Sequence, residues 1–222
     1  MKIIIINGSP RKNGLTAGIL HTIEDRLTQK GAQVSFIELS ELDMKPCRGC
    51  CSCYKNGGCI FKDDAEKLSD EIDAADGLVI GSPTYASNVS GILKTFIDRG
   101  HFVIEQLLIG KYAVSVATGE NYGSGDTGRV INKLLSYSGA DISAKIVQNA
   151  AFNSGRFDRE KAERAADRIY DDISKGSKHI FQRIIQKMIF TAGIRPFVIK
   201  NKENYSGVIS RWQSIGLIDQ KL

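Results

Sequence analysis

The stretch KIIIINGSPRKNGLT, residues 2–16, predicts the fold. Residues 2–7 form a β-branched run, which is typical of a strand buried on both faces of a parallel sheet. A polar, glycine-containing loop follows and leads into a helix, because apolar residues recur every four positions from Leu15 to Leu27. A buried strand, a loop and an amphipathic helix in this order are the first half of a βαβ unit.

The same alternation continues along the chain. Further strands are predicted at 33–39, 77–82, 111–118 and 141–148, with helical patterns between them. The last of these strands alternates apolar and polar residues, as a less covered edge strand does. We therefore predict an α/β fold with a doubly wound, five-stranded parallel sheet, in which ligands bind at the carboxyl ends of the strands.

Composition divides the chain into two parts. We expect a nucleotide-binding type of domain over 1–155, with a cysteine-rich insertion at 43–62, and a helical C-terminal extension over 156–222. The extension carries a net charge of +6, against −1 for the first 155 residues. This excess could attract an acidic partner, a nucleic acid or a membrane surface, but a solvated helix face is the simpler interpretation.

Neither a signal peptide nor a membrane span is expected, because the apolar run near the start is short and no longer run occurs. The sequence therefore predicts a cytoplasmic protein that binds no nucleic acid and no membrane, with reduced thiols.

Three strand ends carry loops suited to a ligand. In the first, residues 7–16, small and hydroxyl-bearing residues precede a helix N-terminus, which favours phosphate binding over a simple turn. Its glycine spacing differs from that of a Walker A loop. The second loop, 81–99, offers Pro83 and the flat ring of Tyr85. The third, 117–128, is rich in glycine. Together they predict a site for a mononucleotide with a large ring.

These three loops are similar to the flavin-binding loops of the flavodoxin-like NAD(P)H-dependent FMN reductases. The segment GSPTYASNVSGILKTFIDR (81–99) carries the most specific likeness. The resemblance implies a flavodoxin-like fold that binds FMN. It assigns the phosphate to Ser9, Arg11, Lys12, Asn13 and Thr16. It assigns the isoalloxazine ring to Pro83, Thr84, Tyr85, Ala86 and Asn88, and its polar edge to Thr118 and Gly119. Ala86 departs from the bulky aromatic residue that such proteins often have there.

All five cysteines lie in CRGCCSCYKNGGC, residues 47–59. Cys47, Cys50, Cys53 and Cys59 read C-x₂-C-x₂-C-x₅-C, a spacing that lets thiolates face one point, as iron–sulfur cubanes require. Zinc sites more often use two separated pairs. Cys51 breaks the spacing and is expected to be a free thiol or a small buried residue. Reduced thiols and adventitious zinc remain alternatives.

The same stretch resembles the iron–sulfur flavoproteins, a branch of that superfamily. This resemblance implies that Cys47, Cys50, Cys53 and Cys59 bind a 4Fe–4S cluster that exchanges electrons with FMN. It also implies a homo-oligomer, either a dimer or a tetramer, in which cluster and flavin approach each other across an interface. We expect the cysteines to lie beside the flavin edge of the sheet.

The predicted activity is that of a flavin-dependent oxidoreductase with no catalytic acid or base from the chain. Ferredoxin or NAD(P)H is the expected electron donor. Two alternatives remain open: an NAD(P)H-dependent FMN or quinone-type reductase without a cluster, and a thiol- or metal-based redox sensor. The histidines, His21, His101 and His179, fall on predicted helices and receive no role. Residues 179–190 carry an apolar stripe, expected to be buried on the domain or against another subunit rather than on a membrane surface.

Overall fold

The computed structural model describes residues 1–151 and 154–220. Its five strands form one parallel sheet in the order β2-β1-β3-β4-β5. The strands are β1 (Lys2–Asn7), β2 (Gln33–Glu38), β3 (Gly77–Pro83), β4 (Tyr112–Gly119) and β5 (Asp141–Asn149). This order and the neighbours described below confirm the predicted doubly wound sheet, and β5 is an edge strand, as its alternating pattern predicts.

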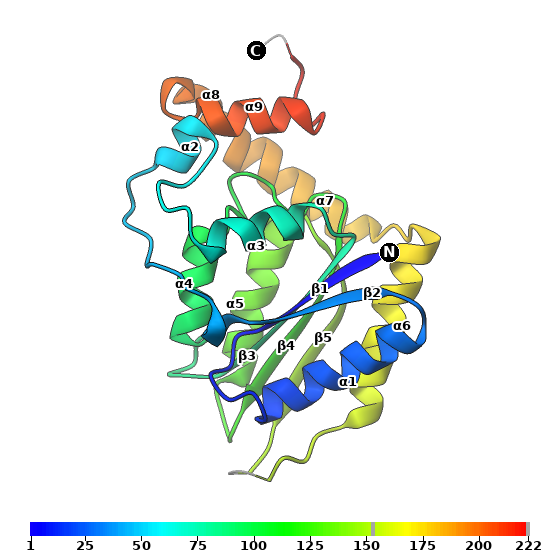
Figure 1. Ribbon diagram of the computed structural model, residues 1–222. Coiled ribbons are helices and arrows are strands. Elements are labelled where there is room, and N and C mark those ends of the chain that lie inside the picture. The colour runs from blue at the N-terminus through cyan, green and yellow to red at the C-terminus, as the bar shows by residue number, and fades with distance from the viewer. Residues whose placement is uncertain (152–153, 221–222) are drawn as a thin grey trace.

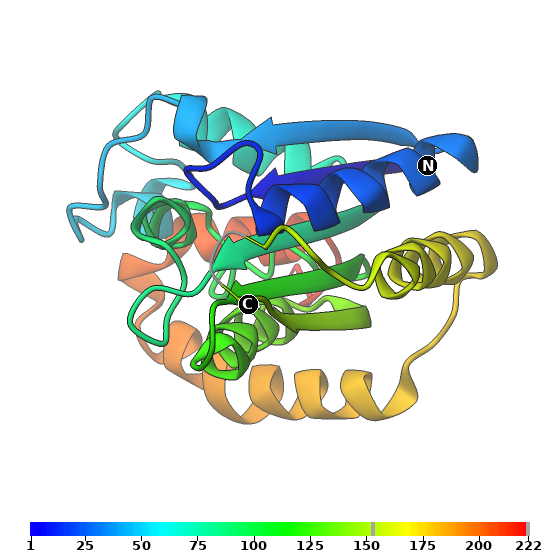
Figure 2. The ribbon, with the colours of Figure 1, turned by 90° about the horizontal axis from the view of Figure 1, so that it is seen from below.

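Helices cover both faces of the sheet (Figures 1 and 2). On one face lie α1 (Leu15–Gln29) and α6 (Arg159–Lys175); on the other lie α3 (Asp64–Asp73), α4 (Gly91–Arg99) and α5 (Ser124–Tyr137). The alternation of side chains along β1 builds both layers at once, because Ile3 and Ile5 pack under α1 while Ile4 and Ile6 pack under α3 and α4. All four isoleucines are fully buried, as a doubly covered strand requires.

The C-terminal extension is helical further than the sequence indicates. After α7 (Ile180–Met188) come a π-helical segment η2 (Ile189–Ile194), α8 (Arg195–Lys200), a 3-10 turn η3 (Lys202–Asn204) and α9 (Ser206–Ser214). The helical periodicity of the sequence ends at about residue 192, so a non-helical tail would be expected beyond it, and α8 and α9 show that this expectation is wrong. A small core of its own holds these turns, centred on the fully buried Trp212. In Figure 1, α9 lies beside the short helix α2 (Ser52–Asn56), which belongs to the cysteine segment and follows the 3-10 turn η1 (Leu39–Glu41).

Helix α7 turns its polar face to the domain and its apolar face outward. Gln182 bonds both backbone groups of Ile142, and Arg183 pairs with the buried Asp141. The apolar side chains point away from the domain and are 51–83% exposed: Ile180, Phe181, Ile184, Ile185 and Met188. Burial of this stripe on the chain's own domain is therefore excluded within the described residues. No described helix combines the length and the apolar character that crossing a membrane requires.

A buried ion pair joins α3 to α4. The carboxylate of Asp63, the N-cap of α3, accepts two hydrogen bonds from Arg99 at the end of α4, at 2.9 and 2.7 Å. Both side chains are almost fully buried. Arg99 also donates to the carbonyl of Lys45 at 2.6 Å and so fixes the chain just before the first cysteine. On the exposed side of α4, Lys94 and Asp98 form a second ion pair, one helical turn apart.

We expect Asp63→Asn to destabilise the protein by about 3 kcal/mol at neutral pH, because Arg99 keeps its charge and loses its partner. Hydrogen bonds from Arg99, opposed by burial and aided by backbone N–H groups, lower the pKa of Asp63 to about 2. Since this pKa lies below that of the unfolded chain, the pair stabilises the fold above about pH 4 and loses that effect as the pH falls towards about 2.

Urea unfolding measured without oxygen at several pH values tests this prediction. The difference in stability between the native chain and Asp63→Asn should shrink between about pH 4 and about pH 2. The control is Asp98→Asn, which removes the exposed partner of Lys94 and should cost less than about 1 kcal/mol. Equal effects of the two substitutions would contradict the buried-pair account.

Candidate functional site

A cavity of about 470 Å³ lies at the carboxyl ends of the strands, where a doubly wound sheet binds its ligands. Its size is within the range of small-molecule sites. Four loops line it, following β1, β3, β4 and β5. The lining residues are Ser9, Arg11, Asn13, Gly14, Leu15, Thr16, Pro83, Thr84, Tyr85, Thr118, Gly119, Glu120, Ala150, Ala151, Ser154 and Gly155.

The end of the cavity next to α1 suits a phosphate. The N-cap of α1, Gly14, supplies no side-chain cap, so the first N–H groups of the helix are left for a ligand. Within this loop the Ser9 N–H donates to Asn7, and the Arg11 N–H donates to the Ser9 hydroxyl at 3.1 Å. These bonds fix the loop as a turn while the charged side chain of Arg11 remains at the cavity.

Close approach of the loop to the sheet requires glycine at position 8. A Cβ atom there would lie 2.8 Å from the carbonyl oxygen of Gly81 and 3.0 Å from the Cβ of Leu93. The Gly8 N–H donates to that same carbonyl at 2.8 Å. The first and second ligand loops are thus in direct backbone contact, which sets the width of the cavity between them.

A buried hydroxyl pair forms the floor of the cavity. The Oγ1 atoms of Thr16 and Thr118 lie 2.7 Å apart, and both residues are almost fully buried. Beside them, the buried Oγ1 of Thr84 has no hydrogen-bond partner among residues 1–151 and 154–220. A buried hydroxyl without a partner is costly, so this atom is suited to a polar ligand.

Residues after Tyr85 form a tight turn rather than a wall of the cavity. Tyr85 and Asn88 exchange two backbone hydrogen bonds at 2.9 and 3.0 Å, and Ala86 and Ser87 between them adopt left-handed conformations. Tyr85 lines the cavity with its ring 47% exposed, whereas Ala86 and Asn88 do not line it. The side chain of Ser90 then caps α4.

Most residues predicted for the flavin are brought together, and three are not. Ser9, Arg11, Asn13, Thr16, Pro83, Thr84, Tyr85, Thr118 and Gly119 line the cavity. Lys12, Ala86 and Asn88 do not, and Lys12 forms an exposed ion pair with Glu41 instead. Sequence reasoning missed the loop after β5, which contributes Ala150, Ala151, Ser154 and Gly155. The predicted strand at 141–148 could have revealed this loop, because the carboxyl ends of all parallel strands meet at one edge of the sheet.

The residues present fit FMN. The uncapped N-terminus of α1 and Arg11 suit a phosphate, and Tyr85 offers a flat ring face. The unpartnered hydroxyl of Thr84 and the polar edge at Thr118 and Gly119 supply hydrogen-bonding groups for the ring.

The cysteine segment lies away from this cavity. In Figure 1 it runs past α4 towards α2 and α9 at the top of the molecule, whereas the loop between β1 and α1 lies at the lower end. None of the five cysteines lines the cavity. The expectation that they lie beside the flavin edge is therefore wrong for a single subunit. The physical reason is that the long insertion after η1 crosses the outer face of α4 instead of staying at the strand ends.

Cys47, Cys50 and Cys51 are exposed, whereas Cys53 and Cys59 are half-buried. Cys51 adopts a left-handed conformation and starts the short helix α2. Among the described residues, the four predicted ligands do not form a compact group with all ligand atoms within 4.8 Å of one another. A cubane is wider than a single ion, since its ligands bind different iron atoms.

The half-buried Cys53 faces His101 and Glu105. One ligand atom from each of these residues lies within 4.8 Å of the others. His101 was predicted on a helix, but α4 ends at Arg99 and His101 follows in a left-handed conformation that few non-glycine residues adopt. Burial lowers the pKa of His101, but its interactions with the nearby Cys53 and Glu105 outweigh this effect and raise the pKa to about 10.

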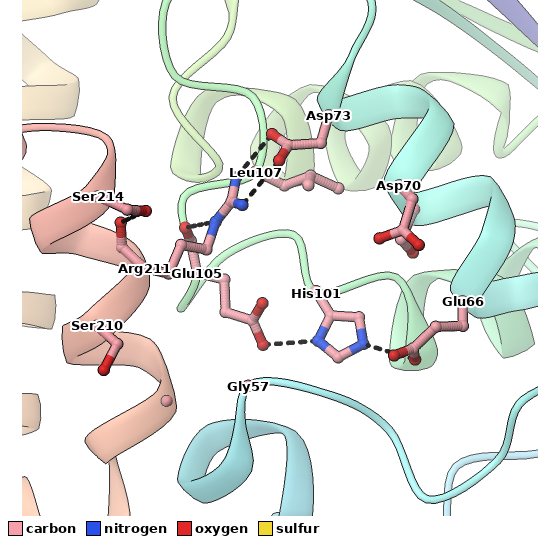
Figure 3. Close-up of a pocket in the computed structure, with 12 residues that line it drawn as sticks. Gly57, Glu66, Asp70, Asp73, His101, Glu105, Leu107, Ser210, Arg211 and Ser214 are labelled. Carbon is pink, nitrogen blue, oxygen red and sulfur yellow. Dashed lines mark hydrogen bonds and ion pairs between the residues drawn. The ribbon is translucent and has the colours of Figure 1, made fainter.

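Figure 3 shows His101 between two carboxylates, with Glu105 on one side and Glu66 on the other. Its Nδ1 lies 2.6 Å from Glu105, and its Nε2 lies 3.5 Å from Glu66. Glu66 follows the N-cap of α3, Asp63, by three residues, and this spacing predicts a capping box. Instead, its two oxygens accept the N–H of Cys59 at 3.2 Å each, because the cysteine segment folds back over the start of the helix.

The C-terminal extension holds this region in place. The rings of Tyr54 and Tyr205 stack at 5.2 Å, and a Cβ atom on Gly207 would lie only 2.2 Å from the nitrogen of Gly57. On the other side of the same helix, Arg211 pairs with Asp73 and donates to the carbonyl of Glu105. Helix α9 therefore positions both α2 and the loop that carries His101.

The cysteine segment fits an iron–sulfur cluster by its donor set and surroundings. Thiolates are the usual ligands of such clusters. Two of the buried polar atoms without a hydrogen-bond partner among the described residues, His101 Nε2 and Arg99 Nε, lie in this region. Arg99 is close enough to the Cys59 thiol for that thiol to raise its pKa, after the larger effects of Asp63 and of burial. Nitrogen donors without partners near two cysteines suit sulfur acceptors.

Comparisons with known proteins show the family and the fold of the chain. Residues 1–158 match the family model described as NADPH-dependent FMN reductase. The chain is similar to an iron–sulfur flavoprotein of Clostridioides difficile, 33% identical over 98% of this chain and 100% of the relative. An iron–sulfur flavoprotein of Archaeoglobus fulgidus is 42% identical over 45% of this chain and 48% of that protein. Among solved structures, a flavone reductase superposes with a TM-score of 0.64 at 19% identity, covering 78% of this chain and 63% of the other, which shows the shared fold.

Proposed function

This chain belongs to the iron–sulfur flavoprotein branch of the NADPH-dependent FMN reductase family, and on that premise we propose that it passes electrons between FMN and a 4Fe–4S cluster. It is a flavin-dependent oxidoreductase with FMN as its cofactor. The observation that carries the proposal is the compact cysteine segment. Its two half-buried thiols, Cys53 and Cys59, lie near buried nitrogen atoms of His101 and Arg99 that have no hydrogen-bond partner among the described residues.

The chain's own residues bind and orient the two groups. Bound FMN would exchange two electrons, and a cluster would exchange one at a time. Arg11 and the N-terminus of α1 would hold the phosphate, and Pro83, Thr84 and Tyr85 would flank the ring. Cys47, Cys50, Cys53 and Cys59 would hold the cluster. No acid or base of the chain is needed, so we assign no catalytic side chain.

A second copy of the chain is the proposed partner of α7. Within one subunit the cysteine segment and the flavin cavity lie apart. Electron transfer between them therefore requires the cysteine segment of one subunit to approach the cavity of another. The outward face of α7 carries Phe181, Ile184, Ile185 and Met188 at helical spacing, as in a helix that packs on another helix. Its polar residues Gln182, Arg183 and Gln186 are already bonded to the domain. We propose that this face joins subunits in a homo-oligomer.

NAD(P)H or a ferredoxin is the proposed electron donor. The family description names NADPH, and the open flavin cavity leaves Tyr85 partly exposed to an incoming ring. The basic C-terminal third would suit an acidic carrier such as a ferredoxin.

Analysis of iron, acid-labile sulfide and FMN in protein purified without oxygen tests the proposal. We expect about four iron atoms, about four sulfides and about one FMN per subunit. FMN without iron would support the alternative of a reductase without a cluster. Reversible thiol oxidation without flavin would support a redox sensor. Either result would overturn the proposed electron transfer.

We expect Thr16→Val to weaken FMN binding about 10- to 100-fold, because it removes a hydroxyl from the floor of the cavity while keeping the shape of the side chain. A hydrogen bond to a charged group contributes about 1.5–3 kcal/mol. Quenching of flavin fluorescence measures the dissociation constant. The control is Thr28→Val, an exposed threonine at the other end of α1, which should leave binding unchanged. An unaltered constant in Thr16→Val would show that Thr16 does not contact the ligand.

A further inference from the structure

We propose that His101 is a positioning residue that donates a hydrogen bond from its Nε2 to the sulfur of Cys53 and thereby raises the reduction potential of the cluster. This inference rests on the proposed function, since it requires Cys53 to be a cluster ligand. It assigns a role to a side chain that the sequence alone left without one.

The first step of the argument is the position of the ring. The side chain of His101 is 9% exposed, and its ring is held at Nδ1 by Glu105, which is itself buried. The backbone of Glu105 is fixed in turn by α9. Its carbonyl accepts a hydrogen bond from Arg211, and the carbonyl of the preceding residue, Ile104, accepts one from the indole N–H of Trp212. A ring fixed at one nitrogen presents the other in a defined direction.

The second step is the state of Nε2. This atom is buried and has no hydrogen-bond partner in the part of the chain that the structure describes. It lies 3.5 Å from Glu66, too far for a good hydrogen bond but close enough for an ionic interaction. The ring thus lies between two carboxylates, Glu105 at Nδ1 and Glu66 near Nε2, and both are acceptors that favour an N–H group on the nitrogen they face. A buried N–H group without a well-placed acceptor is costly, and besides the distant Glu66 carboxylate the sulfur of Cys53 is an acceptor close to the ring.

The third step is the backbone. His101 has a φ of 57°, in the left-handed region that non-glycine side chains seldom occupy. Such conformations persist where the surroundings hold them, and they concentrate at functional sites. The Phe102 ring packs against Gly100 and edge-on against Phe96, so the chain turns sharply just after α4 and directs His101 towards the cysteines.

The charged surroundings are mixed. Two carboxylates face the ring of His101: Glu66, which belongs to α3, and Glu105, which belongs to the loop after α4. The positive charge of Arg99 lies near Cys59 and is paired with Asp63. Hydrogen bonds to the sulfurs are one of the factors that set the potential of such clusters. Reduction adds one electron and breaks no bond, so an N–H group directed at a sulfur favours the reduced, more negative form.

Two substitutions separate hydrogen bonding from structure. In His101→Asn the amide can keep the contact with Glu105 and tolerates the left-handed backbone, but it cannot reach Cys53. In His101→Gln the longer amide can reach Cys53. We expect the reduction equilibrium of the cluster to shift about tenfold towards the oxidised form in His101→Asn, about 59 mV for one electron, and to return most of the way in His101→Gln.

The potential is measured by redox titration followed by electron paramagnetic resonance, with iron and sulfide determined on the same samples. His179→Asn is the control, because His179 also bonds a carboxylate, Asp172, but does not face the cysteines. Unchanged potentials in His101→Asn, equal shifts in both variants, or a His101→Asn protein that binds FMN without a cluster would each overturn the inference. Native protein without iron would instead overturn the proposed function.

Discussion

Cys53→Ser protein, purified without oxygen, should contain less than about a tenth of the iron and sulfide of the native protein but the same amount of FMN. Serine keeps the size of the side chain and removes one of the four proposed thiolate ligands. FMN should be retained because none of the cysteines lines the cavity proposed for the flavin. That cavity is formed by the loops at the carboxyl ends of β1, β3, β4 and β5.

The neighbouring Cys51 provides a matched control. It lies outside the C-x₂-C-x₂-C-x₅-C spacing, and its thiol is directed at the carbonyl of Gly49 at 3.6 Å. Cys51→Ser should therefore retain iron, sulfide and FMN. Equal iron content in Cys53→Ser and native protein would show that Cys53 is not a ligand, and iron loss in Cys51→Ser alone would reassign the ligand set.

Ile184→Asp should dissociate the oligomer. The substitution places a charge in the middle of the outward apolar face of α7, where Ile184 is 51% exposed in one subunit. Burying an isoleucine contributes about 1.5–3 kcal/mol, and a symmetric interface loses that contribution twice, so the dissociation constant should rise at least about 100-fold.

Sedimentation analysis over a range of concentrations measures this effect. Ile215→Asp is the control, since it exchanges another partly exposed isoleucine, at the end of α9 rather than on α7. A native protein that sediments as a monomer would contradict the proposed second copy. An oligomer that persists in Ile184→Asp would move the interface to another surface.

Local patterns in the sequence predicted the sheet and most of the flavin cavity. The isoleucine run of residues 2–7 and the loops after β1, β3 and β4 are each contiguous in sequence, and a parallel sheet brings its strand ends together without further information. Ala86 and Asn88 lie off the cavity lining, in a turn between Tyr85 and Asn88 that is closed by backbone hydrogen bonds, which the motif does not reveal.

The surroundings of the cysteines depend on contacts between distant parts of the chain. His101 reaches Cys53 because α4 stops at Arg99 and because Arg211 and Trp212, more than a hundred positions later, hold the intervening loop. Periodicity assigned His101 to a helix and could not detect this packing. The outward apolar face of α7 was likewise visible as a stripe, but its direction is set by Gln182 and Gln186 bonding to the edge of the sheet.

The most direct test of electron transfer between the two groups is a reductive titration of the native protein without oxygen, followed by visible absorption and electron paramagnetic resonance. The account predicts that about three electrons per subunit are taken up, two by FMN and one by the cluster. It also predicts that NAD(P)H or reduced ferredoxin added in limiting amount reduces both groups. Uptake of only two electrons, with no signal from a reduced cluster, would contradict it.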